Sequence, residues 1–387
     1  MDLLPEDIIC QIIININVKN LMSFIKISVY INKIYQKNMK SMLYGNLSRI
    51  TKYRINKYDI DALKKLYHIS INKSYFTDSD SPILLLTEMG EVYSFDNSMY
   101  ELPEIREIRE SVIIYKPINI PKLEDVIQIS VSNSCSRRYR SSYALTSDGK
   151  VYSMGNNSYG QLGLGNNKFE EEYTLICGIS DVCYISSGDN FSLFLTNNGK
   201  VYSVGCNVYG QLGLENVKNK DNKCIPTVIF RSSNIISIST YGEHCLTLSD
   251  DGKVYGFGRN DYGQLGMGDT NHRKIPTHIS NLPNNIIQLA TGDLHSVVLT
   301  TEGKVYVFGK NFNYRLGLGN NIDISVPTLV PNLPYITQIA ANFGSISLLD
   351  IDGKAYQFNN TNGVIEQIIS KHKIIQISDR GFHKLWY

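Results

Sequence analysis

The chain has 387 residues, of which 42% are hydrophobic and 19% charged, and its formal net charge is +2. This composition can bury a large core and excludes wholesale disorder. No apolar run approaches the roughly 18 uncharged residues of a membrane span, and the start, Met1 to Asp7, is acidic where a secretory signal is basic. We therefore expect no membrane association and a cytoplasmic location, with the nucleus as the alternative.

Isoleucine, asparagine, lysine and tyrosine are over-used, and 26 tyrosines stand against one tryptophan. All four over-used residues have AT-rich codons. The composition therefore predicts an AT-rich genome, such as that of a large DNA virus or a protist. In the viral case the expected location is the host cell.

Residues 1–45 have the spacing of short helices. Apolar residues recur at steps of three and four, first at Leu4, Ile8 and Ile12 and again from Leu21 to Ile25. Pro5, followed by two acidic residues, suits the first turn of a helix. We predict a small α-helical module of two or three helices. Such a module is too small to bury much core alone and needs a partner surface.

The string Leu-Pro-Glu-Asp-Ile-Ile from Leu4, followed by Val18 to Leu21 and by Ile27-Ser28, resembles an F-box. Ile31 stands near the place of that family's usual tryptophan. The resemblance implies docking on a Skp-type adaptor, which links the chain to a cullin ubiquitin ligase. Carried over by position, the adaptor-binding residues are Leu4, Pro5, Ile8, Ile9, Ile12, Leu21 and Ile25. The alternative is a helical cap packed on the rest of the chain.

Residues 46–65 are predicted to form a basic connector. The first 65 residues hold 11 basic and 5 acidic residues, a net charge of +6, whereas residues 66–387 hold 27 and 31, a net charge of −4. The basic residues between Lys33 and Lys57 are interpreted as a solvated helix face and connector, with contact to an anionic surface as the alternative. The mildly acidic larger part argues against a nucleic-acid platform.

An internal repeat dominates residues 66–387. Its marker, Gly-Lys-Val-Tyr, begins at Gly149, Gly199, Gly252 and Gly303, with variants at Gly90 and Gly353. The steps between these six glycines are 59, 50, 53, 51 and 50 residues. A period near fifty residues is typical of solenoids, propellers and repeat arrays.

Each copy predicts four short strands. Around Gly252, an apolar strand precedes a tight turn, whose glycine supplies the positive φ that a two-residue hairpin requires. An alternating strand follows from Lys253 to Phe257, then a Pro-led strand from Pro276 and an Ile-rich strand from Ile286. One unit cannot bury both of its faces, whereas radial stacking covers them. We predict a mainly β chain that forms a β-propeller.

A glycine-rich segment follows the marker strand in four copies. It spans Gly155 to Gly165 and recurs at 205–214, 258–268 and, degraded, at 309–319. A phosphate-binding loop would need a following helix, and four such loops are improbable, so the segments are interpreted as structural turns with close backbone approach. Together with Asp-Gly-Lys-Val-Tyr, this motif resembles the regulator-of-chromosome-condensation repeat. The resemblance covers about residues 66–387 and implies a seven-bladed propeller.

The strand count also favours seven blades. The Ile-rich strand occurs seven times, from Leu66 to Ser378, and the strand before the marker occurs seven times, ending at Tyr387. The marker strand occurs only six times. The seventh blade is therefore expected to be incomplete unless residues before Leu66 complete it, and a six-bladed ring is the alternative.

No residue pattern indicates catalysis. The seven cysteines and seven histidines lack metal-ligand spacing, and no nucleophile motif is present. We predict no metal, no cofactor and no catalytic residue. His244 and His295 lie eight residues before their repeat glycines, and His383 has a similar place after Gly381. We interpret them as hydrogen-bonding groups between blades, or alternatively as contacts for a ligand on a propeller face.

These features predict a protein-interaction protein rather than an enzyme. The favoured hypothesis is a substrate receptor of a cullin-type ubiquitin ligase, in which residues 1–45 dock the adaptor and the propeller binds an unknown target protein. The alternatives are a propeller scaffold unrelated to ubiquitin and a guanine-nucleotide exchange factor for a small GTPase.

Overall fold

The structure, a computed structural model, describes residues 123–132, 141–215, 221–229, 234–358, 362–368 and 377, together with six earlier strands between 66 and 119. The prediction of a mainly β chain is confirmed, because the only helical element in these ranges is the 3-10 turn η5 (Phe312–Tyr314). None of the described residues form a helix that could span a membrane.

The described strands form six four-stranded sheets, which we number as blades 1 to 6. Blade 1 contains β1 (Leu66–Ile71), β2 (Ile83–Thr87), β3 (Val92–Ser94) and β6 (Ile118–Asn119), and the hairpin β4 (Glu107–Arg109) and β5 (Val112–Ile114) lies between β3 and β6 in sequence. Blade 2 contains β7 (Val126–Val131), β8 (Ser141–Thr146), β9 (Val151–Gly155) and β10 (Glu170–Leu175). Blade 3 contains β11 (Val182–Ser187), β12 (Phe191–Thr196), β13 (Val201–Gly205) and β14 (Lys223–Val228).

The last three blades repeat the same order. Blade 4 contains β15 (Ile235–Tyr241), β16 (His244–Ser249), β17 (Val254–Gly258) and β18 (Arg273–His278). Blade 5 contains β19 (Ile286–Thr291), β20 (His295–Thr300), β21 (Val305–Gly309) and β22 (Ile324–Leu329). Blade 6 contains β23 (Ile336–Ala341), β24 (Ile346–Asp350), β25 (Ala355–Phe358) and β26 (Ile365–Ile368).

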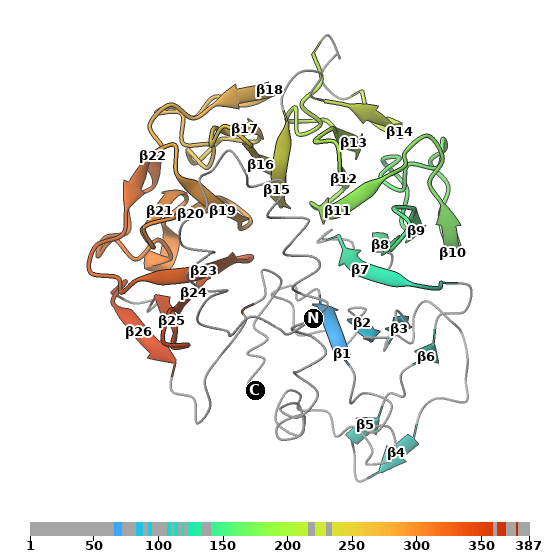
Figure 1. Ribbon diagram of the computed structural model, residues 1–387, viewed down its shortest axis with the longest axis horizontal. Helices are drawn as coiled ribbons and strands as arrows, with labels where there is room; N and C mark the ends of the chain where they lie inside the picture. Colours follow the sequence, from blue (N-terminus) through green and yellow to red (C-terminus); the bar gives the residue numbers. More distant parts are fainter. Residues whose placement is uncertain are drawn as a thin grey trace, which may run out of the picture.

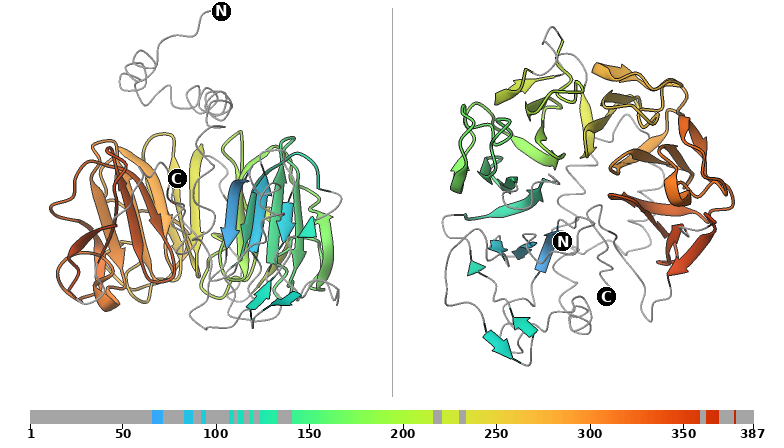
Figure 2. Two further views of the ribbon diagram at one scale, coloured as in Figure 1. Left: turned by 90° about the horizontal axis from the view of Figure 1, so that it is seen from below. Right: turned by 180° about the vertical axis from the view of Figure 1, so that it is seen from behind.

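The blades stand around a common centre in chain order (Figure 1). The first strand of each blade is innermost and the fourth is outermost, and all neighbours within a blade are antiparallel. Seen from the side, the strands of successive blades stand next to one another (Figure 2). This arrangement is that of a propeller, as the repeat predicted.

The turn at the marker glycine is one residue longer than predicted. In blade 4, the Ser249 amide donates to Lys253 O at 3.0 Å, and the Gly252 amide donates to Ser249 O at 3.0 Å. Gly252 has a φ of 82°, whereas Asp250 and Asp251 are not left-handed. The left-handed glycine is therefore confirmed, but the loop is a three-residue turn that ends in a glycine bulge rather than a two-residue turn.

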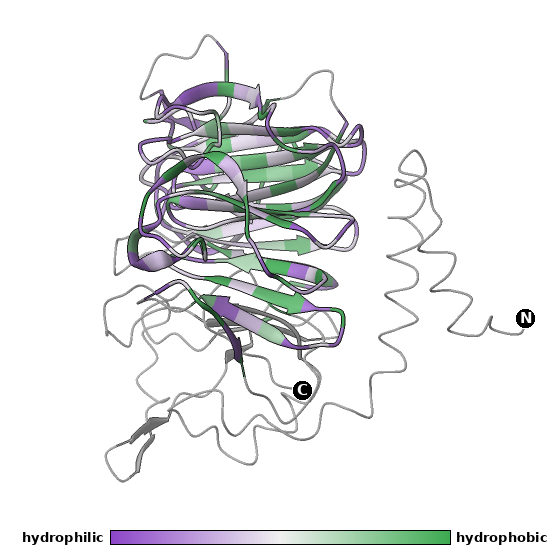
Figure 3. Cartoon of the chain, turned by 90° about the vertical axis from the view of Figure 1, so that its left-hand side faces the viewer, coloured by the Kyte–Doolittle hydropathy of each residue, from purple (hydrophilic) through white to green (hydrophobic). Residues whose placement is uncertain are grey.

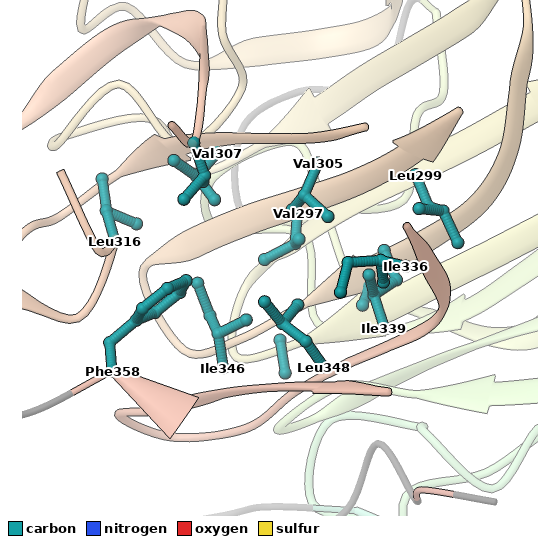
Figure 4. Packing of buried hydrophobic residues seen from close by; sticks show 13 residues of the cluster. Val297, Leu299, Val305, Val307, Leu316, Ile336, Ile339, Ile346, Leu348 and Phe358 are labelled. Atoms are coloured by element: carbon teal, nitrogen blue, oxygen red, sulfur yellow. The ribbon is translucent and has the colours of Figure 1, made fainter. Parts of the chain in front are cut away.

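The hydrophobic cores lie between blades. The largest cluster joins β20 and β21 of blade 5 to β23, β24 and β25 of blade 6, with Val297, Val307, Leu348 and Phe358 among its members (Figure 4). Similar clusters join each earlier pair of neighbouring blades. Hydrophobic residues accordingly follow the stacked strands (Figure 3). Blades 2 to 5 thus bury both faces against their neighbours, which is the reason the repeat needs radial stacking.

Glutamine side chains tie the innermost strands together. Gln128 of β7 donates Nε2 to Ile185 O at 2.8 Å and accepts from Ile185 N at 2.8 Å. Gln288 of β19 makes the same two contacts with Ile339, at 3.0 and 2.9 Å. We call this pair of contacts the glutamine clasp. It satisfies backbone groups that face the gap between strands of adjacent blades.

Ile377 shows where the chain continues past blade 6. Its amide donates to Gln338 Oε1 at 2.7 Å, which repeats half of a glutamine clasp, and its side chain packs beside Leu349 and Ala355. Ile377 therefore occupies the place that Ile339 occupies one blade earlier. The remaining residues of the predicted seventh blade, the helical module 1–45 and the connector 46–65 lie outside the described residues.

Candidate functional site

The two faces of the propeller differ in structure. At the hairpin face, the marker turns meet the links between blades, as where the Val182 amide donates to Gly149 O at 3.1 Å. At the loop face, the glycine-rich loops (156–169, 206–215, 259–272 and 310–323) lie on the same side as the inner turns 188–190, 242–243, 292–294 and 342–345, and backbone hydrogen bonds such as that from Arg259 N to Glu243 O join them. The ion pairs of the hairpin face, such as Lys253–Asp251, join close neighbours and are half exposed, so each contributes little to stability.

An asparagine shapes each glycine-rich loop. Asn157 Oδ1 accepts the buried Leu162 amide at 2.9 Å, and its Nδ2 donates to Asn166 O at 2.8 Å. Asn207, Asn260 and Asn311 accept the equivalent amides at 3.0, 2.9 and 3.0 Å. A Cβ on Gly160 would lie 2.7 Å from Cys224 Cα in the next blade. The predicted structural role of the loops, with close backbone approach, is confirmed.

Arg259 is the centre of a charged cluster between blades 3 and 4. Its Nη1 donates to Glu243 Oε2 at 2.9 Å and its Nε to Asp261 Oδ2 at 2.6 Å. The guanidinium carbon lies 5.1 Å from the centroid of the Tyr209 ring, and His272 meets the same ring edge-on at 5.1 Å. We call these five residues the Arg259 cluster. It combines a cation–π contact with two ion pairs on a partly exposed surface.

A second cluster lies between blades 4 and 5. Lys310 Nζ is 4.3 Å from the centroid of the Tyr262 ring and 5.9 Å from that of Phe312, whose side chain is 53% exposed. Arg315, which replaces the glutamine of the other loops, is buried and donates Nε to Phe312 O at 3.0 Å. Asp293 interacts electrostatically with both cations. We call these five residues the Lys310 cluster.

Burial changes the acidity of one carboxyl group in each cluster. It raises the pKa of Glu243, while the charge of Arg259 partly offsets the rise. It also raises the pKa of Asp293, and three nearby cations, of which Arg259 contributes most, oppose that rise. These charges are partly removed from water before any partner binds. Tyrosine and arginine in such surroundings are typical of the centres of protein interfaces.

The two histidines singled out from sequence lie beneath the loop face. His244 and His295 each have no exposed surface, and His244 Nε2 lies 2.9 Å from Ser296 Oγ in the next blade. Burial lowers the pKa of His244 to about 3 and that of His295 well below its usual range. A side chain without exposed surface does not touch a docked partner, which speaks against ligand contact for both histidines. The predicted hydrogen bond between blades is present for His244, whereas neither ring nitrogen of His295 has a hydrogen-bond partner among the described residues.

The other predicted site residues are not placed. His383 and the adaptor-binding set, Leu4, Pro5, Ile8, Ile9, Ile12, Leu21 and Ile25, lie outside the described residues. Within the described ranges, no group of three or more potential ligands is placed to hold a metal ion. Sequence reasoning missed Arg259 and Lys310. The signal for them is the variable residue of Gly-x-Asn, which is basic in two copies of the repeat.

Comparison with known proteins identifies a family and several relatives that the chain resembles. The RCC1-like domain family matches residues 79–366. The ultraviolet-B receptor UVR8 of Arabidopsis thaliana is 27% identical over 300 residues, which cover 76% of this chain and 65% of UVR8. Protein pim1 of Schizosaccharomyces pombe is 33% identical over 210 residues, or 48% of this chain and 39% of pim1. A Xenopus laevis RCC2 homolog is 34% identical over 139 residues, 35% of this chain and 26% of the homolog. The matches thus span between 26% and 65% of these relatives.

Two solved structures share the architecture. Human WBSCR16 superposes with a TM-score of 0.65 and 24% identity over 81% of this chain and 85% of its own, which shows a common fold. Prp20p of Saccharomyces cerevisiae superposes with a TM-score of 0.57 and 26% identity over 70% and 66% of the two chains. The Prp20p structure was described together with its binding properties to Gsp1p and histones.

Proposed function

Because the chain belongs to the RCC1-like domain family of β-propellers, we propose that it acts by binding proteins rather than by catalysis. Its loop face holds a target protein, and residues 1–45 dock a Skp-type adaptor. The chain then serves as a substrate receptor of a cullin-type ubiquitin ligase, in the cytoplasm or the nucleus.

The observation that supports target binding is the pair of charged clusters on the loop face. Arg259 and Lys310 lie over tyrosine rings of neighbouring blades, and the carboxylates beside them are partly desolvated. Such groups lose little additional hydration when a partner covers them, and they fix its orientation through charge. The blades hold both clusters rigidly, because each cation–ring pair spans a blade junction.

The support for the adaptor is the sequence pattern of residues 1–45. Apolar side chains at helical spacing, such as Ile8 and Ile12, are costly to expose to water, and burying each one contributes roughly 1.5–3 kcal/mol. An adaptor groove would supply that burial. A carboxylate at these positions would be buried without a partner, which is strongly unfavourable.

The test is co-purification of the full chain with a purified Skp-type adaptor. Wild type should form a complex, whereas the double variant Ile8→Asp with Ile12→Asp should not, and Asp2→Asn with Asp7→Asn serves as a control outside the apolar face. Thermal melts of all three proteins report the propeller. If wild type binds no Skp-type adaptor, the ligase role is wrong. If the aspartate variant also melts far earlier, the segment is a cap on the propeller.

Guanine-nucleotide exchange on a small GTPase is the second candidate. It is favoured by the similarity to Prp20p, a protein studied for its binding to Gsp1p. Release of a fluorescent guanine nucleotide from Gsp1p, with and without this chain, separates the two functions. We expect no acceleration, and a catalytic increase in the release rate would favour exchange over the receptor role.

A further inference from the structure

Three junctions between blades share the same backbone hydrogen bond on the loop face. The residue in the middle of Gly-x-Asn is Cys206 in blade 3, Arg259 in blade 4 and Lys310 in blade 5. Their amides donate to the inner turn of their own blade, to Asn190 O at 2.9 Å, Glu243 O at 3.0 Å and Leu294 O at 2.8 Å. The three positions are therefore structurally equivalent.

The tyrosine that each position faces is equivalent as well. Tyr159, Tyr209 and Tyr262 occupy the same place in the loops of blades 2, 3 and 4, and the amide of each donates to the glutamine two residues later, at 2.9, 2.9 and 3.0 Å. Arg259 lies over Tyr209, and Lys310 lies over Tyr262. At the junction of blades 2 and 3, Cys206 therefore has the position from which Arg259 and Lys310 reach their tyrosines, and Tyr159 is the tyrosine of that junction.

The Cys206 side chain is too short to cover the Tyr159 ring, and it carries no positive charge. Its side chain is buried, and the Tyr159 side chain is 39% exposed, the larger exposure that an uncovered ring should have. Among the described residues, cations from the next blade thus lie over Tyr209 and Tyr262 and none lies over Tyr159. The loop that carries it has the same asparagine and glutamine contacts as the others, so its backbone is fixed in the same way.

The surroundings of Cys206 favour a positive charge. Burial raises the pKa of its thiol, and the negative charges of Glu243 and Asp189 add to the rise. Asp189 stands in the inner turn of blade 3 at the position that Asp293 of the Lys310 cluster has in blade 5, since both amides donate to the inner turn of the next blade, to Gly242 O and Asn342 O. An acidic residue is therefore kept at this junction, whereas none of the described lysines or arginines lies over the Tyr159 ring.

We propose that the Tyr159 ring binds a lysine or arginine side chain of the target protein, which takes the place that Arg259 and Lys310 fill elsewhere within the chain. This inference rests on the proposed binding of a protein at the loop face. It specifies the chemistry of that partner: an exposed basic side chain that reaches the junction of blades 2 and 3. Cation–π contact with the ring and attraction to the neighbouring carboxylates provide the recognition.

The test is a titration of the full chain, with ¹³C-labelled tyrosine rings, by N-acetylarginine amide and by its neutral isostere N-acetylcitrulline amide. Tyr159→Phe identifies the Tyr159 signal in the NMR spectrum. We expect that signal to shift saturably, with about two- to fivefold tighter binding of the arginine compound, the ratio that an exposed cation–π contact gives. The covered Tyr262 ring should not respond.

Two variants complete the design. Cys206→Arg supplies the cation internally and should abolish the response of Tyr159, while Cys206→Ser controls for loss of the thiol and should keep it. Lys310→Ala uncovers the equivalent ring and should make Tyr262 respond. Equal binding of the two compounds, or an unchanged response in Cys206→Arg, would overturn the proposal. If Tyr159 ignores arginine while the adaptor still binds, only this inference fails; if Tyr159 responds and no adaptor binds, only the ligase role fails.

Discussion

His244 shows how one buried side chain links two blades. Its imidazole is fully enclosed and lies 2.9 Å from Ser296 Oγ of blade 5. Ser296 in turn donates to Gln264 O at 2.8 Å in the glycine-rich loop of blade 4. The histidine thus connects the core of one blade to the loop that carries Tyr262. Its position in the repeat indicated this role, but the serine partner, 52 residues away, could not be identified from spacing alone.

The burial of His244 predicts a dependence of stability on pH. Its pKa is lowered to about 3 in the folded chain, chiefly by burial, whereas an unfolded histidine titrates near 6.5. Below pH 6.5 the unfolded state binds a proton that the folded state does not, so stability is complete above that pH and falls as the pH drops toward 3. The loss for one histidine is about 2 kcal/mol between pH 7.5 and pH 5.

His244→Gln tests this origin, because glutamine does not titrate. At pH 7.5 we expect the variant to be less stable by about 1 kcal/mol, the usual contribution of one hydrogen bond. Between pH 7.5 and pH 5 its stability should fall less than that of wild type. Urea unfolding at both pH values measures the two quantities. Parallel pH profiles for the two proteins would show that His244 is not the responsible group.

At the scale of elements, the glutamine clasp stabilises the packing of one inner strand against the next. Gln288 satisfies both the amide and the carbonyl of Ile339. Gln288→Leu keeps the bulk of the side chain but leaves these two backbone groups without partners, which should lower stability by about 1–3 kcal/mol. Gln367→Leu on the exposed side of β26 is the matched control and should change stability by less than about 0.5 kcal/mol.

The same substitution one blade later tests how the ring continues. Gln338 Oε1 accepts the Ile377 amide at 2.7 Å, as an inner strand beyond blade 6 would require. We expect Gln338→Leu to lower stability, though less than Gln288→Leu because one backbone group loses its partner instead of two, and the same urea unfolding measures both losses. A Gln338→Leu variant as stable as wild type would indicate that the chain past Ile368 does not form a further inner strand.

The repeat predicted the elements well because each copy carries its own local signals. The strand before Gly252, the left-handed glycine and the following alternating strand all lie within a few residues of one another. The turn length was wrong because the glycine forms a bulge, which the dipeptide does not reveal. The clusters of Arg259 and Lys310 were missed because they pair a variable residue with a tyrosine about one repeat earlier, in the adjacent blade. A pattern read along one copy does not show contacts between copies.

At the scale of the whole molecule, the two parts of the chain differ in charge, which fits the separate roles proposed for them. Residues 1–65 carry a net charge of +6, and residues 66–387 carry −4. The propeller supplies rigid faces, because its cores lie between blades and its junctions fix the loop-face clusters. The first 45 residues supply the apolar pattern expected to dock an adaptor. In this account, target binding and adaptor binding depend on separate parts of the chain and can be removed independently.

The most direct test measures both parts in the same cells. Proteins bound to the chain, and their abundance, are quantified by mass spectrometry in cells that express wild type, the adaptor variant Ile8→Asp with Ile12→Asp, or the loop-face variant Arg259→Ala with Lys310→Ala. We predict a protein that wild type and the adaptor variant capture, that the loop-face variant loses, and whose abundance falls only with wild type. If every captured protein has the same abundance in all three cell lines, the chain is a scaffold and the receptor account is contradicted.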